Sequence, residues 1–214
     1  MNHTETEYRA LLGAAFPPAV LQAVLLAVID GYKATSPACK KALDIPDRHD
    51  AFGIIWRGKI NEQLRGVCEH HSLKFRDEPN SNGSTFFLSI LSPPLRLVAC
   101  LVSWRQHMVR PAKIRKVWAR HNRDGRWRSL FPNTEDPVPP EAEYAVFLIH
   151  GPRGRHRDQP AFVDIVIPDS NFRRYICRVE LFKLFPQIAL SVVKSQDVHR
   201  KQPKPRRRRD TGSA

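Results

Sequence analysis

The chain has 214 residues, of which 42% are apolar, and this is enough to close a hydrophobic core and to exclude wholesale disorder. Its length suits one domain with at most a small appendage. The 35 Lys and Arg residues against 21 Asp and Glu give a formal net charge of +14, which makes the chain strongly basic.

The first 72 residues predict helices. Apolar spacing indicates a short helix over 5–16, a core helix that runs to about Tyr32 and is closed by Asp30-Gly31, and a short third helix over 36–43. A long fourth helix follows over 48–71, with two shorter helices as the alternative because of its glycines. The most apolar run, 19–29, is too short to cross a bilayer, and no basic segment precedes it as in a secretory signal.

The apolar period changes to that of strands after residue 72. We expect a hairpin of 73–75 with 86–91 around the Asn82-Gly83 turn, a buried strand at 95–102, and strands at 144–149 and 161–167 joined by an exposed basic loop. Pro111 opens a short basic helix, and 132–143 is a proline-rich acidic loop. Residues 170–185 favour a helix, with a strand over 175–181 as the close alternative.

These elements predict the α+β class: an N-terminal helical layer followed by a mostly antiparallel sheet with one or two further helices. We expect a single domain over 1–194, with a helical part over 1–72 and a sheet-containing part over 73–194. The polar, basic remainder, 195–214, is typical of a disordered tail.

Positive charge is concentrated in two segments. Residues 103–131 carry nine cations against Asp124 alone, a net charge of +8, and 194–209 carry +7, whereas the rest of the chain is nearly neutral. A charge meant only for solubility would be spread over the surface, whereas a concentrated one attracts polyanions.

The central basic segment is therefore the candidate nucleic-acid site. Lys and Arg neutralise phosphates, and aromatic rings stack on bases or pack against sugars. Trp104 and Trp118 alternate with these cations and serve equally well as core anchors. The residues that we expect to bind DNA or RNA are Arg105, Arg110, Lys113, Lys116, Arg120, Arg126, Trp127 and Arg128.

The basic tail predicts an auxiliary arm that adds phosphate affinity without sequence selectivity. Arg153, Arg155 and Arg157 on the predicted hairpin loop would extend the footprint. The alternative is that both patches face an acidic protein partner, which would make the chain a regulator such as a component of a toxin–antitoxin or defence system.

Two other nucleic-acid functions have partial support. The helices up to residue 71 and the hairpin after them follow the order of a winged helix-turn-helix, although residues 1–102 are nearly neutral. Asp164, Glu180 and Lys183 have the composition of a metal-dependent nuclease, but they form a weak signal.

Nothing else in the sequence indicates an enzyme. Cys68, His70 and His71 are close in the chain but lack a second pair at zinc spacing, while Cys100 and Cys177 lie in apolar runs as core thiols do. Nucleotide-binding and nucleophile motifs are absent. We therefore expect no cofactor, no metal and no membrane partner, and a cytoplasmic, non-enzymatic protein, since four scattered cysteines suit a reducing compartment.

Overall fold

The structure is a computed structural model that describes residues 5–42, 48–79, 86–102, 108–122, 144–153 and 156–191. Its helices are α1 (Glu5–Ala15), α2 (Pro18–Ala42), α3 (Arg48–His70), α4 (Lys113–Trp118), the 3₁₀ turn η1 (Ala119–His121) and α5 (Leu181–Leu184). Its strands are β1 (Lys74–Pro79), β2 (Phe86–Ser92), β3 (Leu95–Leu101), β4 (Tyr144–Arg153), β5 (His156–Pro168) and β6 (Tyr175–Glu180).

The six strands form one sheet in chain order, β1 to β6. Four of the neighbouring pairs are antiparallel, and β3 and β4 are parallel. A parallel pair needs a crossover, and α4 lies in the segment that joins these two strands. The predicted α+β class, with helices first and a mostly antiparallel sheet after them, is confirmed.

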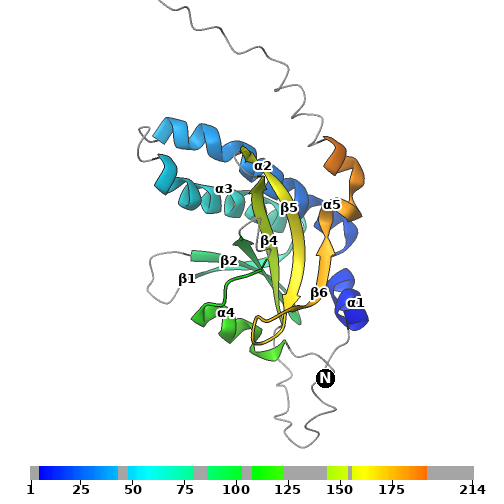
Figure 1. The fold of residues 1–214 in the computed structure, drawn as a ribbon. Helices are drawn as coiled ribbons and strands as arrows, with labels where there is room; N and C mark the ends of the chain where they lie inside the picture. Colours follow the sequence, from blue (N-terminus) through cyan, green and yellow to red (C-terminus); the bar gives the residue numbers. More distant parts are fainter. Residues whose placement is uncertain are drawn as a thin grey trace, which may run out of the picture.

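Helices cover both faces of the sheet, so its central strands are apolar on both sides (Figure 1). Val146 and Leu148 of β4 face the core under α1, α2, α3 and α5, whereas Phe147 and Ile149 face the smaller core under α4. The edge strand β1 is largely exposed and carries charged side chains, which discourage pairing with another chain.

The second predicted helix does not end at Asp30-Gly31, and the short third helix is not separate. Instead α2 continues to Ala42 with Pro37 inside it. Proline removes one backbone donor, but Tyr32, Thr35 and Cys39 are buried and hold this half of α2 in the core. Gly31 serves close packing, since a Cβ there would lie 2.7 Å from Cγ1 and 3.0 Å from Cα of Ile60 on α3.

Gly31→Ala is therefore expected to lower the free energy of unfolding by about 1–2 kcal/mol, because the overpacking against α3 exceeds the gain in helix propensity. Urea unfolding measures this change. Gly66→Ala on α3 is the matched control, since its added Cβ meets no atom within 4 Å beyond its chain neighbours and the backbone of its own helix. Gly66→Ala should stabilise the protein by about 0.5–1 kcal/mol. If Gly31→Ala also stabilised the protein, α2 and α3 would be able to move apart at no cost in free energy.

The predicted helix at 170–185 is wrong, and the alternative strand is present as β6. Asp169 caps a tight turn, its Oδ1 accepting a hydrogen bond from the Arg173 amide at 2.8 Å. Phe172 takes a positive φ of 56° in this turn. The Pro-Asp-Ser sequence therefore closes a hairpin, with chemistry that equally suits a helix start.

The basic loop predicted at 151–160 is also largely strand, because β4 continues to Arg153 and β5 begins at His156.

The helices before β1 do not have the winged helix-turn-helix arrangement. The predicted third helix belongs to α2, and α3 packs along α2 through Ile60 and Leu64, which are buried. The β1–β2 hairpin is the edge of the main sheet.

By length and composition Pro18–Cys39 could span a membrane, but Val24, Leu25 and Val28 are fully buried, as in a core helix.

Candidate nucleic-acid interface

The basic helix α4 is anchored on the sheet by aromatic packing. Trp118 is buried and meets the Phe87 ring edge-on, with 5.6 Å between the ring centroids. The Arg96 guanidinium lies over the same indole, 5.8 Å from its centroid. Trp118 is therefore a core anchor, and it cannot stack on a base.

A buried asparagine fixes the end of this segment. Asn122 has no exposed surface, and its Nδ2 donates to the carbonyls of Ala145 and Pro168 at 2.7 and 3.0 Å. Its Oδ1 accepts a hydrogen bond from the Ala145 amide at 3.0 Å. These bonds tie η1 to β4 and to the end of β5, so the helix before them has a fixed position on the sheet.

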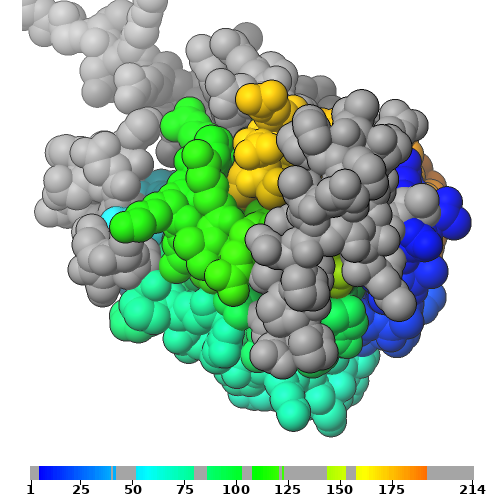
Figure 2. Space-filling model, turned by 90° about the horizontal axis from the view of Figure 1, so that it is seen from below, coloured from blue at the N-terminus to red at the C-terminus, as the bar shows by residue number. Residues whose placement is uncertain are grey.

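Four of the predicted binding residues lie together on this anchored segment. Arg110, Lys113, Lys116 and Arg120 are all exposed, at spacings of three or four residues. Figure 2 shows α4 in green on the molecular surface, beside strands of the sheet. In the part of the chain that the structure describes, no carboxylate forms an ion pair with Arg110, Lys113 or Lys116.

Arg115 differs from its neighbours, although the helical pattern places it with the outward-facing cations. Its Nη1 donates to the Arg110 carbonyl at 2.8 Å, and its Nε is buried without a partner. The side chain also approaches the Cys100 thiol. Burial raises the pKa of Cys100, and the nearby Arg115 and Arg57 charges oppose this rise. Arg115 therefore belongs to the contact of α4 with the sheet.

The remaining predicted residues cannot be placed. Arg105, Arg126, Trp127 and Arg128 lie outside the described residues, as do Trp104 and the tail from residue 195. Arg153 ends β4, but neither its side chain nor that of Arg157 is described, and Arg155 lies between the described ranges.

The carboxylates of the nuclease hypothesis are engaged in ion pairs. Asp164 is buried, and its Oδ2 accepts hydrogen bonds from Nε and Nη2 of Arg178 at 3.0 and 2.6 Å. Glu180 lies opposite Asp164 on β6 and pairs with Lys183 at 2.9 Å. Within the described residues no group of three His, Cys, Asp or Glu could hold a metal ion. This geometry is that of a structural ion pair.

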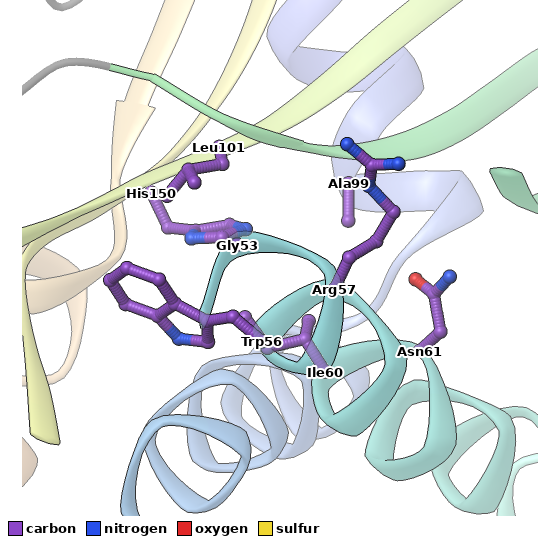
Figure 3. Close-up of a pocket in the computed structure, with 8 residues that line it drawn as sticks. All are labelled: Gly53, Trp56, Arg57, Ile60, Asn61, Ala99, Leu101 and His150. Carbon is purple, nitrogen blue, oxygen red and sulfur yellow. The ribbon is translucent and has the colours of Figure 1, made fainter. Parts of the chain in front are cut away.

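A pocket on the opposite face of the sheet was not predicted from the sequence. It lies between α3 and the ends of β3 and β4, has a volume of about 30 Å³ and opens to solvent (Figure 3). The residues that line it are Gly53, Trp56, Arg57, Ile60, Asn61, Ala99, Leu101 and His150.

His150 of this pocket is buried and neutral. Burial lowers its pKa from 6.5 to about 3, and its Nδ1 lies 3.0 Å from the Tyr32 hydroxyl. Burial also raises the pKa of Tyr32 well above 10, so this hydroxyl keeps its proton. If His150 donated instead, the buried Tyr32 hydroxyl would lose the only acceptor that the described residues offer it. Tyr32 therefore donates to Nδ1, and the proton of the imidazole is on Nε2.

No protein-family model matches the chain, and neither the curated proteins nor the solved structures contain a significant match.

Proposed function

We propose that the chain is a non-enzymatic nucleic-acid-binding protein of the cytoplasm, which contacts phosphates through the exposed cations of the α4 segment. The observation that carries the proposal is a contrast between cations. Several cations on other elements are neutralised locally, as in the pairs Arg9–Glu5, Lys33–Asp30 and Arg65–Asp77. Exposed cations without such a pair in the described part of the chain, among them Lys41 and Lys74, are scattered over separate elements. Arg110, Lys113 and Lys116 have no such carboxylate among the described residues, so their charge is available to an external anion.

The anchoring of α4 supports this role. A cation on a fixed helix loses less conformational freedom on binding than one on a flexible segment. The predicted partners of these cations, Arg105, Arg126, Trp127 and Arg128, are close to α4 in the chain and would extend the same surface, and the basic tail would add reach. Four free, buried cysteines suit a reducing compartment.

The double variant Lys113→Glu/Lys116→Glu is expected to weaken binding of duplex DNA or RNA by about tenfold or more, because it removes two phosphate contacts and adds repulsion. The slope of log affinity against log salt should fall by about 2. Fluorescence anisotropy at several salt concentrations measures both quantities, and circular dichroism shows whether the fold is intact.

Lys41→Glu/Lys74→Glu is the matched control, because it makes the same change in net charge at exposed cations outside α4. If both double variants lost the same amount of affinity for nucleic acid, binding would depend only on the net charge of the protein. If deletion of 195–214 alone abolished binding, α4 would not be the site.

An acidic protein partner is the second candidate. Val117 favours it, because this apolar side chain is 53% exposed among the α4 cations and would gain more from burial in a protein interface than beside phosphates. The wild-type salt dependence separates the two functions, since a slope near zero on DNA and RNA would exclude phosphate contacts.

A further inference from the structure

The pocket between α3 and the β3–β4 edge combines apolar walls with several polar side chains. Ile60, Ala99 and Leu101 supply apolar surface. Arg57 and Asn61 reach from α3 toward β3, and His150 lies at the other end of the pocket (Figure 3). A concave apolar site with a few converging polar groups is the usual form of a small-molecule site. Its volume of about 30 Å³ is far below the usual range, so only a small group such as a carboxylate fits inside, and the rest of a ligand extends toward the open side.

Asn61 adds a polar group that a ligand in the pocket can satisfy. Its side chain is more than nine-tenths buried, yet within the described residues no group forms a hydrogen bond with its amide. Buried amides elsewhere are satisfied, as the three bonds of Asn122 illustrate. The amide of Asn61 is not fully shielded from the open pocket, so a ligand bound there can take the place of water as its hydrogen-bond partner.

The polar groups around the pocket are mainly donors. Arg57 lies over the Phe87 ring at 5.9 Å and has no carboxylate partner among the described residues, so its guanidinium can bind an anion. The Tyr32 bond leaves the Nε2–H of His150 as a neutral donor. One positive charge, two neutral donor groups and apolar walls suit a single negative charge on a carbon skeleton better than a dianion.

We propose that this pocket binds a small organic acid, whose carboxylate accepts hydrogen bonds from Arg57 and Asn61 and whose carbon skeleton packs on Ile60 and Leu101. A second oxygen of the ligand accepts a hydrogen bond from Nε2 of His150. The pocket lies on the helical face of the sheet and the exposed cations of α4 on the other, although Arg57 extends to the Phe87 ring, which packs on the α4 face. The proposal does not depend on phosphate binding by α4.

The test is an NMR titration of the full chain with acetate, butyrate and benzoate, with benzamide as the neutral counterpart of benzoate and inorganic phosphate as a simple anion. At least one acid should shift the Trp56 indole and Asn61 amide signals saturably, and benzamide should bind at least about tenfold more weakly than benzoate if benzoate is that acid. Absence of saturation with all three acids at millimolar concentration overturns the proposal. If phosphate binds as tightly as the best acid, the pocket is a site for inorganic anions, and the proposal is overturned as well.

Two variants connect the binding to the side chains. Arg57→Gln should lower the affinity for the best-binding acid by about tenfold or more. Lys59→Gln, on the same helix and paired with Glu62, should change that affinity by less than about twofold. If Arg57→Gln fails to fold, Asn61→Asp serves instead, because its carboxylate repels the ligand. If the variant that folds binds the acid with unchanged affinity, the acid binds at another site and the proposal is wrong. No nucleic acid is present, so the outcome is independent of the α4 experiment.

Discussion

Replacement of Asn122 by alanine is expected to lower the free energy of unfolding by about 3–5 kcal/mol, a large share of the stability of a domain of this size. The variant removes three buried hydrogen bonds and leaves the Ala145 amide and the carbonyls of Ala145 and Pro168 without partners. The cost exceeds that of three ordinary bonds, because each backbone group left behind is desolvated.

Urea unfolding measures this loss, and near-ultraviolet circular dichroism reports whether Trp118 keeps its packing. Lys116→Ala is the control on the same segment, because this side chain is exposed and unpaired among the described residues, and it should change stability by less than about 0.5 kcal/mol. A loss below about 1 kcal/mol for Asn122→Ala would mean that water replaces the amide and that α4 is not fixed by this contact.

The basic helix shows how far sequence patterns predict a surface. Helical spacing and the run of cations are enough to predict an amphipathic α4 with exposed Lys113 and Lys116. They do not predict that Val117 is exposed or that Arg115 turns toward Cys100. Those orientations depend on how the helix is rotated against the sheet, and this rotation is set by distant contacts such as that of Trp118 with Phe87.

Two of the wrong element predictions share a physical cause. Gly31 and Pro37 weaken a helix locally, but packing of α2 against α3 outweighs the local cost. Asp169 caps a turn as readily as a helix. The segment after it forms a strand because its backbone pairs with the free edge of β5 as β6. The apolar period predicted the long α3 and the buried strand at 95–102 correctly. Helix α3 contains Gly53, Gly58 and Gly66, but the packing of α3 against α2 outweighs the low helix propensity of glycine.

The pocket could not be predicted because its residues come from three separate segments. Arg57 and Asn61 have the spacing of an ordinary helix face, and His150 ends an apolar run that predicts only a strand. Only the parallel pairing of β3 with β4 brings His150 beside Leu101. The one available signal is a histidine inside an apolar run, which is typical of a buried imidazole in general and of no particular site.

The second large effect is a loss of stability in acid caused by His150. The pKa of this imidazole is about 3 in the folded protein, against 6.5 for an exposed histidine. Between these values the unfolded chain binds a proton at this position and the folded chain does not, so the free energy of unfolding falls as the pH falls. The slope approaches about 1.4 kcal/mol per pH unit, and the loss from pH 6.5 to 4 is about 3 kcal/mol.

His150→Gln removes this titration and keeps a polar side chain near the Tyr32 hydroxyl. Its stability at pH 7 should be lower than that of the wild type, because the packing of the imidazole against Tyr32 and Trp56 is lost. From pH 6.5 to 4, however, its stability should fall by about 3 kcal/mol less, and other titrating groups cancel in this comparison. NMR supplies the direct control, because the ring protons of His150 should not titrate in this range. A midpoint near 6.5 for those protons would show that the imidazole is solvated, and the donor assigned to Nε2 in the pocket would then be wrong.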